Sequence, residues 1–286
     1  MRDAFIAGFK TGLQQWKIAA IVYVLQLCLA LALGMQVFHV LEASIGKSLE
    51  ISKLIYGYDH TVLTDFLKVH GASITPLIGQ LRWLILVYLL FAVFIDGGLL
   101  YGVATSQPVQ GHTFWKGGAT YFFPFLKIGL LLLLPLLLWT LVVWMPFGLC
   151  LEASLLFFPS EAYTVWLAVG LLAVYGVGLA ILFVWSVLSR LAVIQTGVGI
   201  GAGLRQGWRL FKGNKKRLLG LLGLFLLLKS AFLVVYFALE AATGMQSPLL
   251  IGVFFVVQQA LVFFRIQIRQ MVYAGLAKQV YPNTEF

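Results

Sequence analysis

The residue best placed to do chemistry is Asp96, a carboxylate inside an otherwise apolar run. Three arginines, Arg190, Arg265 and Arg269, lie at comparable depth in two later apolar runs. A charge in hydrocarbon is costly, so we expect Asp96 to face other helices and to pair with one of these arginines. Two interpretations stay open: a relay for protons or substrate, and a buried ion pair that fixes helix packing. The second is favoured, because a transport path usually shows several such groups in series.

The polar residues of the last two apolar runs leave the same two interpretations open. Lys229 either lines the interior or extends its amine towards the interface. Four amides either line a cavity or hydrogen-bond between helices. They are Gln258, Gln259, Gln267 and Gln270.

Positive charge is concentrated in the stretch 203–229, where a basic, aromatic segment runs into an apolar one. Such a segment is typical of a helix that lies at the membrane surface before the chain turns into the bilayer. Trp208 and Phe211 are expected to turn towards the acyl chains, while basic side chains reach the phosphates of anionic lipids. The candidates for headgroup binding, here and in two similar segments, are Lys10, Lys17, Lys116, Lys127, Arg205, Trp208, Arg209, Lys212, Lys215, Lys216 and Arg217.

The elements that must carry these residues are membrane helices. Apolar residues make up 61% of the chain and charged residues only 10%, so lipid is the solvent for most of it. The net charge of +10 is confined to short segments between apolar runs, which argues against a nucleic-acid partner. The predicted fold is an all-α integral membrane protein in one domain, 1–286. Its six spans are expected at about 18–40, 82–105, 126–147, 163–190, 218–239 and 249–273.

Orientation follows from the positive-inside rule. Fifteen of the 20 lysines and arginines lie on the side of the N-terminus when these spans are threaded through a bilayer. Both termini are therefore expected in the cytoplasm, with the protein in a bacterial cytoplasmic (inner) membrane. The loop 41–81 is expected outside, with two short amphipathic helices interrupted at Gly57 and Gly71.

A threefold repeat is expected from glycine spacing. The pairs are Phe5 and Gly8, Phe114 and Gly117, and Leu204 and Gly207, each followed nine or ten residues later by a lysine and then by a span. The predicted repeat consists of one interfacial helix and two spans.

This pattern resembles a broad family of bacterial six-span proteins, which includes the membrane domain attached to some glycerophosphoryl diester phosphodiesterases and the uncharacterised YciC-like membrane proteins. The residues that carry the resemblance lie at 203–214, 97–100 and 113–118. The resemblance implies a helical membrane domain without established catalytic residues. The chain has no room for the phosphodiesterase barrel, so that activity is not implied.

No enzymatic motif of a recognised kind is present in the sequence: there is no HExxH, GxSxG or Walker loop. We therefore expect no enzyme activity, cofactor or metal. Cys28 and Cys150 are interpreted as small core residues without a disulfide. The favoured function is a non-catalytic scaffold or complex subunit that organises anionic lipids or protein partners. The alternative is a small transporter or channel with a polar path centred on Asp96.

Overall fold

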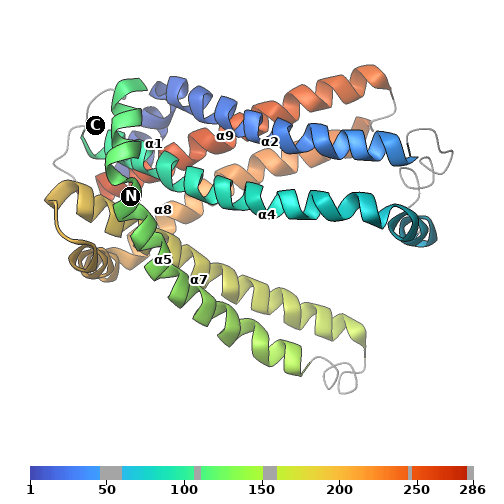
Figure 1. Ribbon diagram of the computed structural model, residues 1–286. Coiled ribbons are helices and arrows are strands. Elements are labelled where there is room, and N and C mark those ends of the chain that lie inside the picture. Colours follow the sequence, from blue (N-terminus) through green and yellow to red (C-terminus); the bar gives the residue numbers. More distant parts are fainter. Residues whose placement is uncertain (46–59, 106–110, 151–159, 244–246, 282–286) are drawn as a thin grey trace. The chain divides into compact units, whose positions relative to one another are not determined.

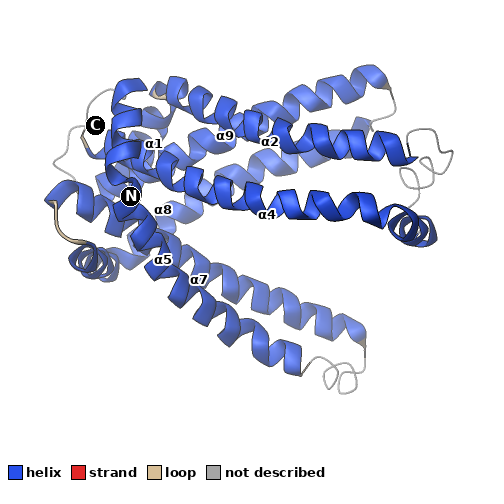
Figure 2. Ribbon diagram, viewed as in Figure 1, coloured by secondary structure: helices blue, strands red, loops and turns tan. Residues whose placement is uncertain are grey.

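The computed structural model describes residues 1–45, 60–105, 111–150, 160–243 and 247–281, and all regular structure in these ranges is helical (Figure 2). The helices follow one another without a strand in these ranges (Figure 1). They are α1 (Arg2–Gln14), α2 (Trp16–Ile45), α4 (His60–Ala104), α5 (Gly111–Leu149), α7 (Glu161–Thr196), α8 (Ile200–Thr243) and α9 (Pro248–Val280).

Six of these helices are long and apolar enough to cross a bilayer. Each contains or overlaps one of the apolar runs, and the described part of the chain is an all-α six-span membrane protein. The stretches that meet the length and hydropathy criteria are Trp16–Val40, Gly79–Ala104, Gly111–Leu149, Ala162–Thr196, Ile200–Thr243 and Leu249–Val280.

Local sequence explains where several helices begin and end. The Ser160 hydroxyl accepts a hydrogen bond from the backbone N–H of Ala162 at the start of α7. Ser247 caps α9 in the same way, and Pro248 follows at the first helical position, where its missing N–H has no cost. Helix α7 ends at Gly197, whose φ of 63° favours a residue without a Cβ.

The junctions between predicted interfacial helices and spans take three forms. Helices α1 and α2 are separated at Gln15, and α8 has a non-helical residue at Asn214 (φ −126°, ψ 18°). Helix α5, in contrast, is one continuous helix that contains Pro124, so the expected separate interfacial helix is its first part. The proline, which lacks an N–H, lies seven residues after Gly117; Gln15 and Asn214 lie seven after Gly8 and Gly207.

The segment expected as an outer loop differs from the prediction. Helix α2 continues to Ile45, and α4 starts at His60 and runs unbroken through 71–78 into its apolar part. The second expected loop helix is therefore the start of α4, because helical hydrogen bonding continues past Gly71. The first expected loop helix and Gly57 lie outside the described residues.

The chain forms two compact units, Ala20–Ala92 and the remainder, Met1–Ala19 with Val93–Phe286. The smaller unit consists of most of α2 and the first part of α4. In the larger unit α1 packs on α9, α5 on α7, α7 on α8 and α8 on α9. All sites described below lie within the larger unit.

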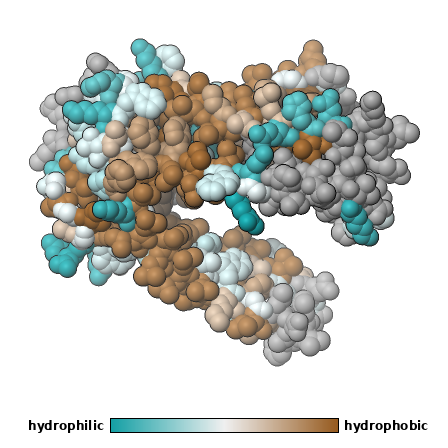
Figure 3. Space-filling model, viewed as in Figure 1, coloured by the Kyte–Doolittle hydropathy of each residue, from teal (hydrophilic) through white to brown (hydrophobic). Residues whose placement is uncertain are grey.

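The outward surface of the larger unit is largely apolar along its helices. Leu134 and Val142 on α5 and Trp166 on α7 are each more than 60% exposed. Apolar side chains exposed on a membrane span are expected to contact the acyl chains of lipids. Figure 3 shows mainly hydrophobic residues along α5 and α7. Both cysteines are free and exposed, so the core position expected for Cys28 and Cys150 is not observed.

Candidate functional site: a buried carboxylate with two arginines

The carboxylate of Asp96 accepts hydrogen bonds from three side chains. Arg190 Nη1 donates to Oδ2 over 2.5 Å, and Tyr273 Oη donates to Oδ1 over 2.6 Å. Arg269 Nη2 also donates to Oδ1, and its Nε donates to Tyr273 Oη over 3.0 Å. The cluster therefore joins α4, α7 and α9 through one buried carboxylate, which is 8% exposed.

Small residues next to Asp96 allow α4 to approach α5 closely. A Cβ at Gly97 would lie 3.1 Å from the carbonyl oxygen of Gly117, and one at Gly98 would lie 2.7 Å from that of Phe114. Helix α4 can therefore bring Asp96 into the core only because both residues lack side chains.

Aromatic rings hold the cationic members of the cluster. The Arg190 guanidinium carbon lies 5.3 Å from the centroid of the Phe125 ring, and that of Arg269 lies 5.7 Å from the Tyr273 ring. The Tyr273 ring in turn stacks on Phe183 with centroids 6.2 Å apart. These contacts fix both guanidinium groups against α5 and α9.

Sequence reasoning anticipated one arginine partner, whereas the structure brings two to Asp96. Tyr273 was not anticipated, although its position four residues after Arg269 places it on the same helical face. Arg265, the third candidate, is not a partner of Asp96: its side chain is exposed and lines a groove with Lys229. It precedes Arg269 by four residues on nearly the same face of α9, about 6 Å further from the cluster along the helix axis.

The arrangement is suited to holding helices together. Both oxygens of Asp96 are occupied by donors, and the cluster carries two guanidinium groups for one carboxylate. No hydrogen bond described here connects the glutamine side chains of α9 to the Asp96 cluster. The Gln258 amide donates to Tyr236 Oη over 2.6 Å, and within the described ranges the buried Gln270 amide has no hydrogen-bond partner.

The glycines of the three basic segments pack against ends of spans. A Cβ at Gly8 would lie 2.5 Å from the Met271 carbonyl oxygen, and one at Gly207 would lie 2.7 Å from the Ser189 nitrogen. The carbonyl oxygen of Gly117 faces Gly97, as described above, while a Cβ at Gly117 would lie 2.5 Å from the Cβ of Tyr101 on α4. The contacts with Met271, Ser189 and Gly97 fall within two residues of Arg269, Arg190 and Asp96, respectively. The segments α1, early α5 (111–127) and early α8 (200–217) therefore lie close to the members of the cluster.

The basic side chains of these segments, and that of Lys17 at the start of α2, point away from the packed glycine faces. Ten are exposed: Lys10, Lys17, Lys116, Lys127, Arg205, Arg209, Lys212, Lys215, Lys216 and Arg217.

Trp208 and Phe211 differ from the expectation that they face acyl chains. Phe211 is 5% exposed, and the Trp208 ring lies 5.0 Å from that of Trp185 on α7. Lys212 Nζ lies 5.4 Å from the Trp208 ring centroid. This face turns inwards because Gly203 and Gly207 bring early α8 against α7.

Comparisons with models of protein families, with curated proteins and with solved structures found no match to this chain.

Proposed function

We propose that this protein is a non-catalytic scaffold or complex subunit of a bacterial cytoplasmic membrane, and that its basic segments hold anionic lipid headgroups. Both termini then lie in the cytoplasm, where anionic headgroups attract clustered lysines and arginines. The observation that carries the proposal is the two-sidedness of α1, early α5 and early α8. Each segment has a glycine face packed on a span and a basic face that is exposed.

We also propose that the three segments belong to three structural repeats. Each packs near the end of the second span of another unit: early α5 on α4, early α8 on α7, and α1 on α9. Asp96, Arg190 and Arg269 come from these three second spans and meet at one point. A repeat places equivalent positions around a common axis, so one ionic cluster can hold all three units.

The transporter alternative finds less support. A relay carboxylate must exchange protons or ligand, whereas both oxygens of Asp96 accept bonds from fixed donors. The hydrogen bonds described for the glutamines of α9 do not form a polar path that leads away from Asp96. Reconstituted vesicles test the alternative: flux abolished by Asp96→Asn in a folded protein would favour transport over the scaffold.

The lipid role is tested with three adjacent exposed residues of early α8, Lys215, Lys216 and Arg217. Their combined replacement by glutamine should reduce the phosphatidylglycerol that co-purifies with the protein, measured by mass spectrometry of protein released from nanodiscs. Each basic residue near an anionic surface contributes about 1 kcal/mol, so affinity should fall by about two orders of magnitude.

The matched control keeps charge and exchanges side chains: Lys215→Arg, Lys216→Arg and Arg217→Lys. It should retain lipid at the level of the unchanged protein. Equal phosphatidylglycerol retention by the neutral and the charge-preserving variants would contradict the proposal, and preferential retention of phosphatidylcholine would do so as well.

A further inference from the structure

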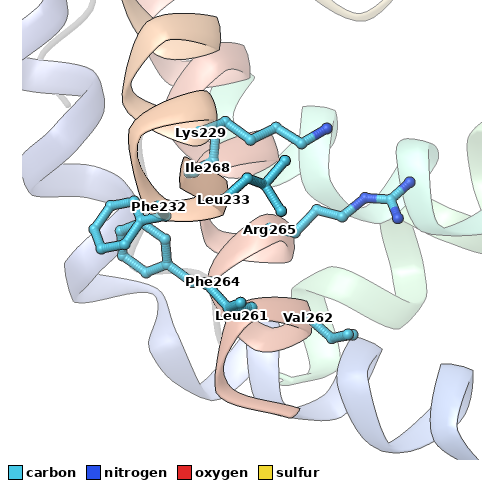
Figure 4. A pocket seen from close by; sticks show the side chains of 8 residues that line it. All are labelled: Lys229, Phe232, Leu233, Leu261, Val262, Phe264, Arg265 and Ile268. Carbon is cyan, nitrogen blue, oxygen red and sulfur yellow. The ribbon is translucent and has the colours of Figure 1, made fainter. Parts of the chain in front are cut away.

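A groove between α8 and α9 carries two cations on apolar walls (Figure 4). It has a volume of about 170 Å³. Lys229 comes from α8 and Arg265 from α9, and Figure 4 shows both side chains extending to the same side. The remaining lining residues are apolar: Phe232, Leu233, Leu261, Val262, Phe264 and Ile268.

The position of the two cations along their helices is unusual. Lys229 lies close to the middle of the part of α8 that follows Asn214, and Arg265 close to the middle of α9. In the expected spans 218–239 and 249–273, Lys229 lies about 10 residues, roughly 15 Å, and Arg265 about eight residues, roughly 12 Å, from the nearer span end. Either distance exceeds the length of a lysine or arginine side chain, so neither group reaches an aqueous end simply by extending along its own helix.

Neither cation has a carboxylate partner among the described residues, where Asp96 pairs with Arg190 and Arg269 instead. A charged side chain within a membrane span costs free energy, and such a side chain is typical of a binding site or a transport path. The Lys229–Arg265 pair adds mutual repulsion to that cost. An anion bound in the groove would reduce both the cost of placing charge in a span and the repulsion between Lys229 and Arg265.

The walls define the rest of the ligand. The Phe232 and Phe264 rings pack with centroids 4.3 Å apart, so aromatic carbon closes one side of the groove. The groove volume is enough for a small anionic head and the first few carbons of a chain. The remainder of such a chain can continue along the apolar helix surfaces into lipid.

We propose that this groove binds the anionic end of a single membrane amphiphile, with Lys229 and Arg265 on its carboxylate or phosphate and the apolar wall on its acyl chain. The site is distinct from the basic segments of α1, α5 and α8, and it does not depend on the scaffold function. Two sources have the required chemistry, a free fatty acid and a phospholipid.

The test uses the full chain in phosphatidylcholine nanodiscs with two photoreactive probes, a diazirine oleate and a diazirine phosphatidylglycerol. Cross-linked peptides are mapped by mass spectrometry. Labelling is expected at 229–233 and 261–268, and the combined Lys229→Gln and Arg265→Gln variant should lower it by about tenfold or more, since two charge contacts are lost. The probe that shows this loss identifies the source.

Three controls keep the result decisive. Lys229→Arg with Arg265→Lys preserves charge and should restore labelling. A diazirine oleyl alcohol, which is neutral, should label the unchanged protein and the glutamine variant equally. Lys215→Gln with Lys216→Gln removes two charges from early α8, and should leave groove labelling unchanged even if surface lipid binding falls.

The glutamine variant replaces the half-buried Lys229 and the exposed Arg265 by polar side chains of similar length, so it should fold; its melting temperature in detergent is measured alongside. Labelling by both anionic probes that is unaffected by the loss of Lys229 and Arg265 would overturn the proposal. Loss that the charge-preserving variant fails to restore would also overturn it.

Discussion

Replacing Asp96 by alanine removes the acceptor of three hydrogen bonds and leaves the buried Arg190 and the half-buried Arg269 without their carboxylate. Loss of one partner from a buried ion pair costs about 3–5 kcal/mol, because the remaining charge stays desolvated. Arg190 is the more buried of the two, with 11% of its side chain exposed against 28% for Arg269. We expect a loss of about 4 kcal/mol in the free energy of unfolding.

Double-mutant cycles distinguish the partners. Alanine at Arg190 or at Arg269 should each recover part of the loss caused by Asp96→Ala, with coupling energies of about 1–3 kcal/mol. The control is Arg265, an arginine of the same helix as Arg269 that lies in the groove with Lys229. Its coupling to Asp96 should stay within about 0.5 kcal/mol.

The assay is reversible unfolding of the detergent-solubilised protein, followed by far-UV circular dichroism for all single and double variants. Secondary structure before unfolding must match the unchanged protein, so that the free energies compare like states. A loss below about 1 kcal/mol for Asp96→Ala would refute the view that a buried cluster holds these helices together. Coupling to Arg265 as large as that to Arg190 would refute the assignment of partners.

Two further predictions follow from packing and topology. Gly207→Ala should lower the free energy of unfolding by about 1–3 kcal/mol, because its Cβ would overlap the backbone of α7, whereas Gly213→Ala, with open space around it, should be neutral or slightly stabilising in the same assay. Single cysteines at Ser160 and Asn214, in a background without the two native cysteines, should react with membrane-impermeant reagents from opposite sides; reaction of both from one side would contradict the six-span topology.

The six-span helical fold could be read from the sequence alone, because each span is a local property. About 20 consecutive apolar residues must be helical in a bilayer, since only a helix satisfies their backbone groups within one segment. The Ser160 and Ser247 caps and the αL residue Gly197 are local signals of the same kind. The continuation of α4 through Gly71 was not predictable, because a glycine weakens a helix without ending it.

The partners of Asp96 depended on tertiary structure. An intramembrane carboxylate requires a cation, so the sequence determined that an arginine would be near and supplied three candidates. Arg265 and Arg269 lie on nearly the same face of α9, about 6 Å apart along its axis, so the sequence offers both as partners. The axial position of α9 relative to α4 decides between them, and this is set by tertiary packing such as the close approach of α1 to α9 at Gly8 and of α4 to α5 at Gly97.

In early α8, too, the sequence predicted the helix, while tertiary structure decided which way its aromatic face turns. The sequence predicted an amphipathic, basic helix, because charged and aromatic residues recur at helical spacing. It did not determine whether Trp208 and Phe211 would meet lipid or protein, since both are apolar surroundings for an aromatic ring. Only the packing of Gly203 and Gly207 on α7 decided that, because contact at this distance turns the aromatic face inwards and leaves the basic side chains outside.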